Sequence, residues 1–446
     1  MFVGVRQFVF GALGLMMQTA VVSQEQASSH ASALPEPLTL EYALSLSQDS
    51  HPSLQRMDAA IQKALASKQS IATSNNLELN LEGRLQWIDP SKKAVDQSDD
   101  DHRMGIIAKK KLYDSGRHEA QTTAATYQIH SQRLHYQKAL YVHRIEIMRL
   151  FFDVLLADLK FYRYNEEMAV AFIQWDRIKE RRRLNQAIDV DVLKLETEYQ
   201  KIRRLRFHSE AMQRQTRSRL AAALNFPGQL PLTLAQPDLN VLDKIIPEIE
   251  LLQKQALENN LGLRILRQRL NAAKQGLEAA RSTYAPDLTG NIEAYSYSRE
   301  IGSSDPWRAG ITLTVPLYSG GRSSAVTAVA KANEYQTQAE LKEQEYIVQQ
   351  AVLETWLKLD TLRIQREEMR TLASYQETSL DQSRALYELE IKADLGKAMV
   401  RVSEAEYQVK LTDFEMAIAW ENLNLLIGQL NTGQGIDKTS VSGDKK

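Results

Sequence analysis

Leu112-Tyr113-Asp114-Ser115-Gly116-Arg117 returns 205 residues later as Leu317-Tyr318-Ser319-Gly320-Gly321-Arg322. Two more segments recur in the same order: Gln48-Asp49-Ser50-His51 as Leu257-Glu258-Asn259-Asn260, and Ile188-Asp189-Val190-Asp191 as Ile391-Lys392-Ala393-Asp394. Their offsets are 209 and 203 residues, so the two copies are nearly equal in length. Because recurrence at a fixed period indicates repeated structural units, the sequence predicts one unit built twice.

Proline placement predicts long helices in both units. The eleven prolines leave two wide gaps, one between Pro90 and Pro227 and one after Pro316. Because proline breaks the interior of a helix, both gaps can be helical throughout. The first gap predicts a helix over 117–183, about 100 Å long at ~1.5 Å per residue. Shorter return helices are predicted over 190–224 and 395–427.

Apolar residues in these segments are spaced by alternating steps of three and four. The runs are Ile145, Met148, Phe152, Leu155, Leu159 and Tyr162; Ile188, Val192, Leu195, Tyr199 and Ile202; and Ile391, Leu395, Ala398, Val402, Ala405, Val409, Thr412, Met416, Ala419, Leu423 and Leu426. Such spacing is typical of a coiled-coil seam, which keeps one narrow stripe against a neighbouring helix. Ordinary core helices are the alternative, although their apolar faces are usually wider.

Half-length helices are expected at the start of each unit, over 40–74 and 248–284. Two of them placed end to end would lie alongside one long helix. The proline-rich stretch 227–247 then predicts a linker between the units, which extend over 38–226 and 248–428.

Apolar and polar residues alternate between each half-length helix and the next long helix. Leu77, Leu79, Leu81, Gly83, Leu85 and Trp87 alternate with Glu78, Asn80, Glu82, Arg84 and Gln86, and Leu288, Gly290, Ile292 and Ala294 alternate with Thr289, Asn291, Glu293 and Tyr295. This period predicts strands with one apolar and one polar face. Partner strands are predicted over 103–112 and 307–317.

Strands of about ten residues with these two faces match a transmembrane β-barrel. In such a barrel the pore-facing candidates are Glu78, Asn80, Glu82, Arg84, Asn291 and Glu293. A soluble β-sandwich edge is the alternative. Lys110 departs from the pattern, because the repeat gives it the outward place of Val315. Since lysine near a membrane interface can extend its ammonium to water, we place Lys110 close to an interface.

The composition argues against several functions. A net charge of −1 without a basic tail gives no reason to expect nucleic acid as a partner. The absence of cysteine excludes disulfides, thiolate metal sites and cysteine nucleophiles. Neither a histidine pair at metal-binding spacing, nor a phosphate-binding loop, nor a G-x-S-x-G elbow is found. No catalytic, cofactor or metal site is therefore predicted, and the chain is not expected to be an enzyme.

The first residues predict export. Arg6 precedes the apolar run 8–17, and small residues follow around Ala20 and Ser23, the pattern of a secretory signal over 1–23. A buried N-terminal helix is the alternative. Segments 24–37 and 429–446 are predicted to be flexible. No other stretch approaches the ~20 apolar residues that a membrane-spanning helix needs.

Together these features resemble the TolC family of outer-membrane efflux proteins, over about residues 38–428. The resemblance rests on the start 38–44, the strand exit 315–321 and the helix-return segments 184–193 and 387–395. In those return segments Ala187 and Glu390 stand where the family motif has glycine.

The resemblance implies a mixed α/β membrane protein. Four strands per chain would contribute to a twelve-stranded homotrimeric barrel in the outer membrane, and long helices to a periplasmic tunnel. It implies passive export of small molecules or polypeptides in a tripartite efflux or type I secretion system. The implied partners are a periplasmic adaptor protein, an inner-membrane pump and outer-membrane lipid. The alternative is a periplasmic coiled-coil adaptor without a pore.

The turns between long and return helices would place Asp191 and Asp394 one turn inside the periplasmic end. In a trimer each acidic tip residue becomes a ring of charge, which favours cations. We hypothesise that Glu390 and Asp394 line the aperture, the narrow periplasmic end of the tunnel. Lys392 and Arg384 are their candidate partners on the same hairpin. Alternatively, these charges face the periplasm.

Overall fold

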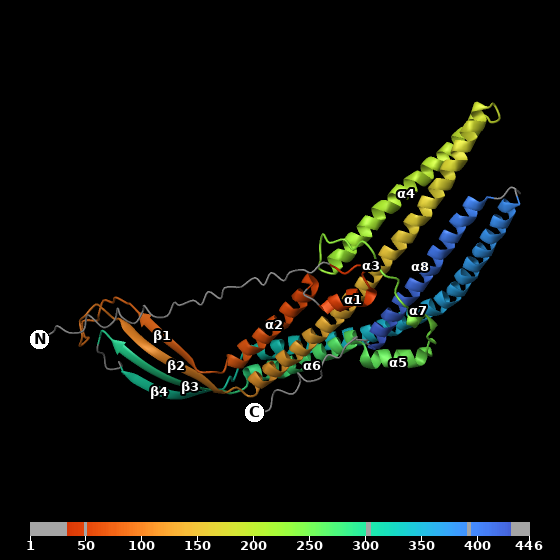
Figure 1. Cartoon of the computed structure of the whole chain (residues 1–446). Helices are drawn as coiled ribbons and strands as arrows, with labels where there is room; N and C mark the ends of the chain where they lie inside the picture. Colours follow the sequence, from red (N-terminus) through yellow and green to blue (C-terminus); the bar gives the residue numbers. More distant parts are fainter. Residues whose placement is uncertain (1–33, 49–50, 300–304, 390–393, 430–446) are drawn as a thin grey trace. The chain divides into compact units, whose positions relative to one another are not determined.

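The computed structural model describes residues 34–48, 51–299, 305–389 and 394–429. The predicted signal segment, most of segment 24–37 and residues 430–446 lie outside them. The described residues from Glu36 onward form one compact body (Figure 1). In chain order its elements are α1 (Leu40–Ser45), η1 (Leu46–Gln48), α2 (Pro52–Thr73), β1 (Glu78–Arg84), β2 (Arg103–Tyr113), α3 (Arg117–Arg183), α4 (Asp189–Ala223), η2 (Asn240–Asp243), α5 (Ile249–Asn259), α6 (Leu261–Arg281), η3 (Ser282–Tyr284), β3 (Asp287–Tyr297), β4 (Trp307–Thr314), α7 (Arg322–Glu388) and α8 (Leu395–Ile427).

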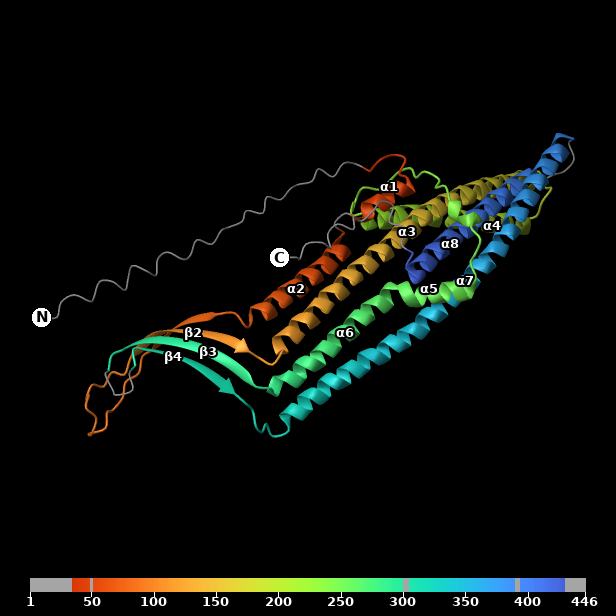
Figure 2. The same ribbon diagram turned by 90° about the horizontal axis from the view of Figure 1, so that it is seen from below.

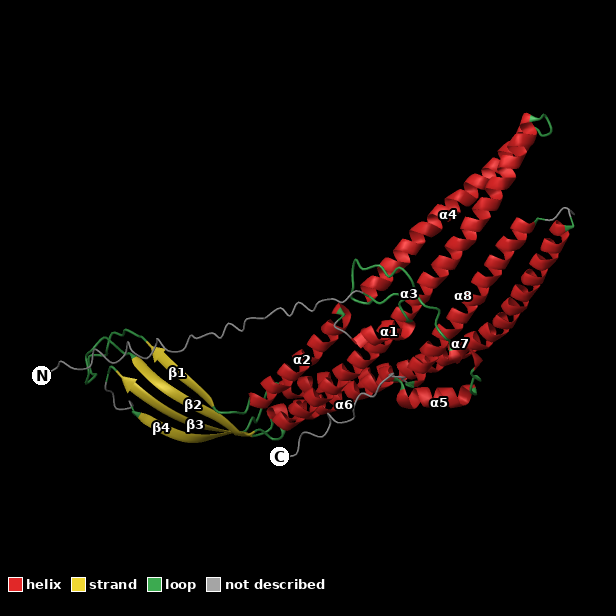
Figure 3. Cartoon of the chain, viewed as in Figure 1, coloured by secondary structure: helices red, strands yellow, loops and turns green. Residues whose placement is uncertain are grey.

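The four strands form one antiparallel sheet in the order β1-β2-β3-β4 (Figure 3). The predicted strands are therefore present, although two end early. β1 stops at Arg84, and Trp87 keeps only an isolated bridge to Asp100. β4 stops at Thr314 because Pro316 follows closely and has no N–H to donate to a ladder.

Two helical hairpins repeat the same design. α3 packs against α4 and α7 against α8, and both long helices have 67 residues. Each long helix begins after a glycine with a left-handed backbone, Gly116 at φ 80° and Gly321 at φ 83°. Because glycine adopts that conformation without steric cost, the recurring Ser-Gly-Arg and Gly-Gly-Arg segments mark the corner between strand and long helix. Among the described residues, no helix is both long and apolar enough to cross a lipid bilayer.

The half-length helices are each broken, which corrects the prediction of one continuous helix per unit. The breaks separate α1 from α2 and α5 from α6. His51 caps α2 by accepting from the Ser53 N–H at 3.3 Å, and Asn260 caps α6 by accepting from the Leu263 N–H at 3.2 Å. Side-chain caps of this kind start a new helix and compete with continuation of the old one. His51 and Asn260, the last residues of the two recurring segments, therefore each start a new helix.

The apolar seam of α8 is present from Leu395 to Leu426, with every predicted position buried or half-buried. Near the C-terminal end, burial also reaches Phe414 and Trp420, since α3, α5, α7 and η2 all contact α8. Phe414 stacks on Phe152 of α3 with ring centroids 4.3 Å apart. α8 therefore buries only a narrow apolar stripe near the tip and a wider apolar face toward its C-terminal end. In α3 the predicted seam ends early, because Tyr162 is exposed.

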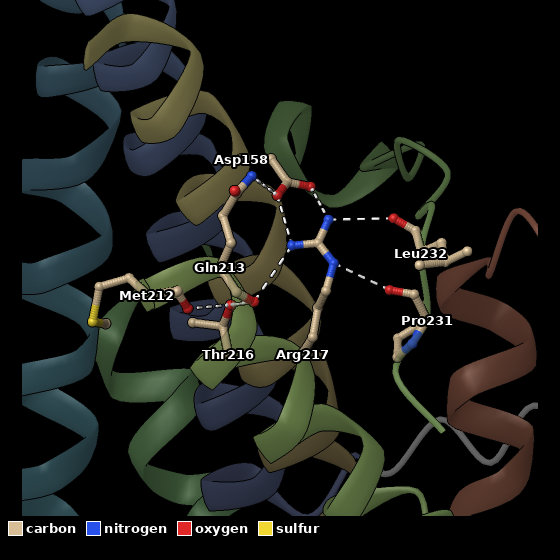
Figure 4. Close-up of polar contacts among 7 residues, drawn as sticks. All are labelled: Asp158, Met212, Gln213, Thr216, Arg217, Pro231 and Leu232. Carbon is tan, nitrogen blue, oxygen red and sulfur yellow. Dashed lines mark hydrogen bonds and ion pairs between the residues drawn. The ribbon is translucent and has the colours of Figure 1, made fainter. Parts of the chain in front are cut away.

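Residues 227–247, which we call the strap, are held at their first end by Arg217 of α4 (Figure 4). Its guanidinium binds both carboxylate oxygens of Asp158 on α3, at 2.8 and 2.9 Å. It also donates to the carbonyl oxygens of Pro231 at 3.1 Å and Leu232 at 3.3 Å. The strap is thereby fixed to both helices of the first hairpin.

The other end of the strap is held by α7. Arg366 donates to the Leu242 carbonyl at 3.2 Å and to the Asp243 carboxylate at 2.9 Å, and it binds Asp413 of α8 at 2.9 Å. The Trp356 indole donates to the Pro247 carbonyl at 3.0 Å. The linker predicted between the two units is therefore an ordered segment bound to both hairpins.

Candidate functional site

The predicted pore-facing residues all lie on one face of the sheet. The register sets Glu82 opposite Gly105, Gly105 opposite Tyr295, and Asn291 opposite both Lys109 and Gly310. Because cross-strand partners share a face and alternate residues return to it, the predicted set Glu78, Asn80, Glu82, Arg84, Asn291 and Glu293 is brought together.

Opposite charges are paired on this polar face. Arg103 donates to Glu82 at 2.7 Å, and Arg308 lies 3.6 Å from Glu293. The Asn291 amide donates to Glu293 at 3.2 Å. The sequence analysis did not select the two arginines or Lys109, although the same period of two within the partner strands would have identified them.

A glycine permits an aromatic ring to lie flat on the polar face. A Cβ on Gly105 would come within 2.1 Å of the Tyr295 ring, so a larger residue cannot occupy that position. The Arg103 guanidinium lies over the same ring, 5.2 Å from its centroid. The Tyr295 ring is thus held between the backbone at Gly105 and the Arg103 guanidinium on the polar face.

The opposite face of the sheet is apolar and exposed. The register aligns Leu81 with Ile106, Ala294 and Trp307, and Leu79 with Ala108, Ile292 and Ala309. Five large side chains of this face, Leu79, Leu81, Ile292, Ile311 and Leu313, are each more than half exposed. Lys110 lies on this face opposite Gly290, as the repeat predicted. The sheet therefore has one charged side and one apolar side that no described element covers.

A second candidate surface lies on the helices. α2, α3, α6 and α7 follow one another side by side (Figure 2). A groove of about 970 Å³ runs along all four, so it lies on one face of this layer. Amides and three charged residues line it together with alanines of α2, α3 and α6; these polar residues are Gln121, Gln128, Gln132, Asn333, Gln336, Lys63, Arg269 and Glu340. These polar residues were not anticipated, because they come from four separate segments.

The tip of the first hairpin carries an ion pair that the sequence analysis missed. Arg182 holds Asp189 through two hydrogen bonds, at 2.6 and 3.3 Å, across the turn between α3 and α4. These bonds lower the pKa of the Asp189 carboxyl. Asp191 lies in the first turn of α4 and is exposed.

At the second tip, Asp394 is the N-cap of α8 instead of a residue one turn inside it. It accepts from the Lys397 N–H at 3.2 Å and pairs with the Lys397 ammonium at 2.9 Å. Burial alone would raise the pKa of Asp394, but these contacts outweigh it and hold the pKa below its usual value. Arg384 pairs with Asp381 at 3.3 Å. Glu390 and Lys392 lie outside the described residues.

The two hairpins contact each other between α3 and α8. Arg163 and Glu404 form an ion pair at 2.6 Å, and the Ser403 hydroxyl donates to Glu166. Gly396 lies so close to Val170 that a Cβ there would meet the valine Cγ2 at 2.7 Å. This close approach places the α7–α8 hairpin against α3 below the tips.

Within the described ranges, histidine, aspartate and glutamate nowhere gather in a group of three or more that could hold a metal ion.

Residues 252–429 match the model of the outer membrane efflux protein family. No protein of curated function is similar enough in sequence to count as a relative. Solved structures are similar over most of their length. A membrane protein from Pseudomonas aeruginosa is 19% identical, with a TM-score of 0.72 and coverage of 87% of this chain and 90% of that one.

Two further structures share the fold. The CmeC outer membrane channel of Campylobacter jejuni is 12% identical, with a TM-score of 0.74 and coverage of 87% and 85%. The outer membrane protein VceC of Vibrio cholerae is 14% identical, with a TM-score of 0.67 and coverage of 87% and 96%.

These matches confirm the predicted fold class and the predicted resemblance to TolC-like channels. The chain has the fold of an outer-membrane efflux channel protein, and residues 252–429 carry the sequence pattern of the outer membrane efflux protein family. The family match covers the second unit. The first unit repeats its architecture, with a long helix of the same length and the same glycine corner.

Proposed function

We propose that this chain is the outer-membrane exit duct of a tripartite efflux or type I secretion system, assembled as a homotrimer. The observation that carries the proposal is the sheet with one charged face and one predominantly apolar, exposed face. A periplasmic adaptor without a pore has no use for such an apolar face, so that alternative is not favoured.

The trimer follows from the edges of the sheet. In the order β1-β2-β3-β4, the outer sides of β1 and β4 are unpaired within the described chain. An open edge in lipid leaves backbone groups unsatisfied at a cost of several kcal/mol each. β4 of one copy can pair antiparallel with β1 of the next, and three copies give the ~12 strands of a closed barrel.

The helical hairpins would extend this barrel into a tunnel. The groove along α2, α3, α6 and α7, with its amides and charges, suits a water-filled lumen better than a protein core. Transport through such a lumen is passive, and the proposal assigns no catalytic step to the chain. An inner-membrane pump would supply the energy, and a periplasmic adaptor would join the pump to the hairpin tips.

Purification in detergent followed by mass measurement and planar-bilayer recording tests the proposal. We expect a trimer that forms channels. Ile311→Lys puts a charge on the apolar face and should destabilise the inserted barrel by up to about 2–4 kcal/mol. Thr312→Lys, one residue along on the polar face, is the matched control and should insert normally. A stable monomer that conducts ions, or equal insertion of both variants, would contradict the proposal.

A further inference from the structure

A groove of about 680 Å³ crosses the apolar face of the sheet. Small residues form its floor. Across the strands, Ala108 and Ala309 lie on either side of Ile292, and Gly290 lies beside Ile311. Larger side chains around them, Leu112 among them, form the walls. Its volume is in the ~300–1,000 Å³ range of small-molecule sites.

Lys110 is the one charged residue that lines this groove. No acidic residue of the four strands lies on the apolar face with Lys110. The register places every aspartate and glutamate of β1–β4 on the polar face. The two ion pairs of the sheet, Glu82–Arg103 and Glu293–Arg308, are on the polar face as well. The lysine thus lacks a counter-charge from its own sheet at a position where a cation is costly.

The depth of Lys110 points to the counter-charge. It lies three residues before the end of β2 at Tyr113, where the chain turns into α3. At ~3.4 Å per residue and a strand tilt of ~40°, this is about 8 Å inside the helical end of the sheet. A lysine side chain covers most of such a distance, so its ammonium can approach the headgroup level. Lipid phosphates lie at that level.

We propose that this groove binds an anionic phospholipid of the periplasmic leaflet. One acyl chain lies along Ala108, Gly290 and Ala309, and the lipid phosphate pairs with the Lys110 ammonium. Net-negative headgroups are favoured over zwitterionic ones, whose own ammonium competes for the phosphate. The inference rests on the outer-membrane placement above and adds a specific ligand to it.

The test is native mass spectrometry of the purified trimer, titrated with phosphatidylglycerol or with phosphatidylcholine of identical acyl chains. A single lysine near a membrane surface contributes about 1 kcal/mol, so we expect about fivefold tighter binding of phosphatidylglycerol. Lys110→Gln should abolish that preference. Lys109→Gln removes the adjacent charge on the opposite face and should retain it.

Ala309→Leu fills the groove without adding polarity and should weaken binding of both lipids. The lipid site is overturned if Lys110→Gln keeps the preference, if Lys109→Gln loses it equally, or if Ala309→Leu binds both lipids unchanged. A wild-type trimer without any preference also overturns it and leaves the proposed function intact. A chain that forms no trimeric channel overturns the proposed function and the lipid site together.

Discussion

Arg217 and Arg366 hold opposite ends of the strap, from helices that occupy different places in the two hairpins. In the first hairpin the arginine is on the return helix and its partner Asp158 on the long helix. In the second hairpin Arg366 is on the long helix and Asp413 on the return helix. The arginine and the aspartate therefore exchange places between the return helix and the long helix of the two hairpins. Both guanidiniums nevertheless donate to carbonyl oxygens of the strap. The prolines of the strap have no N–H, so the strap has fewer donors of its own for these carbonyls.

Removing Asp158 should destabilise the protein strongly. Its side chain and that of Arg217 are 22% and 15% exposed, so Asp158→Ala leaves a largely buried cation without a counter-charge. We expect a loss of about 2–3 kcal/mol in the free energy of unfolding, measured by denaturant titration. Asp360→Ala is the control, because its pair with Arg363 is about half exposed and should contribute at most about 0.5 kcal/mol. Equal losses of unfolding free energy in Asp158→Ala and Asp360→Ala would contradict this role of the Asp158–Arg217 pair.

His143 should make stability fall in acid. It is buried on α3 and stacks on His51 with ring centroids 4.4 Å apart. Burial lowers the pKa of His143, and the neighbouring His51 lowers it further. Below about pH 6.5 the unfolded chain therefore binds more protons than the folded one. This contribution to stability is complete above pH ~6.5 and is lost as the pH falls toward the lowered pKa.

The measurement for His143 is the melting temperature between pH 7.5 and 5. His143→Gln should reduce the slope of melting temperature against pH. Some slope should remain, because burial also lowers the pKa of His135. An unchanged slope in His143→Gln would contradict the assignment.

A methyl group on Gly396 should push the two hairpins apart. Since its Cβ would lie 2.7 Å from Val170 Cγ2, Gly396→Ala should cost about 1–3 kcal/mol through overpacking. Val170→Ala makes room for the added methyl, so the double variant should recover most of that loss. Unfolding of both single variants and the double variant gives the coupling energy. Additive losses would mean that the close approach does not constrain the hairpins.

The acidic residues at the second tip should set cation preference if they line the aperture. Asp394→Asn removes the charge but keeps an N-cap side chain, whereas Asp394→Ala would also cost ~1 kcal/mol of helix stability. We expect Asp394→Asn and Glu390→Gln to lower the ratio of cation to anion permeability in planar bilayers. Asp191→Asn reports on the first tip in the same assay. Unchanged selectivity and conductance in the second-tip variants would place both residues outside the pore.

Much of the helical architecture could be predicted from short stretches. The 3-4 spacing in α8 and the absence of proline after Pro316 are local signals, and the predicted bounds of that helix agree with the structure. The broken half-length helices were missed because a cap such as Asn260 depends on one side chain competing with the helix backbone. A weak signal was present, because the capping positions belong to a recurring segment.

The candidate pore face was predictable for the same reason. Alternation places Glu78 and Glu82 together whatever the partner strand is, since the period of a strand is two. The pairing of Glu82 with Arg103 required the register between β1 and β2, which a long connecting loop does not determine.

The sequence by itself determined the duplication, the helices and the two-faced strands, because recurrence, proline placement and periodicity are patterns along the chain that do not depend on which segments pack together. Only the tertiary structure decided which side chains meet across helices: Arg217 with Asp158, Arg163 with Glu404, and Gly396 with Val170. Each residue advances a helix by about 100°, at ~3.6 residues per turn. A shift of one residue between two packed helices would therefore replace every one of these partners. The spacing of residues within one helix does not determine its register against another helix.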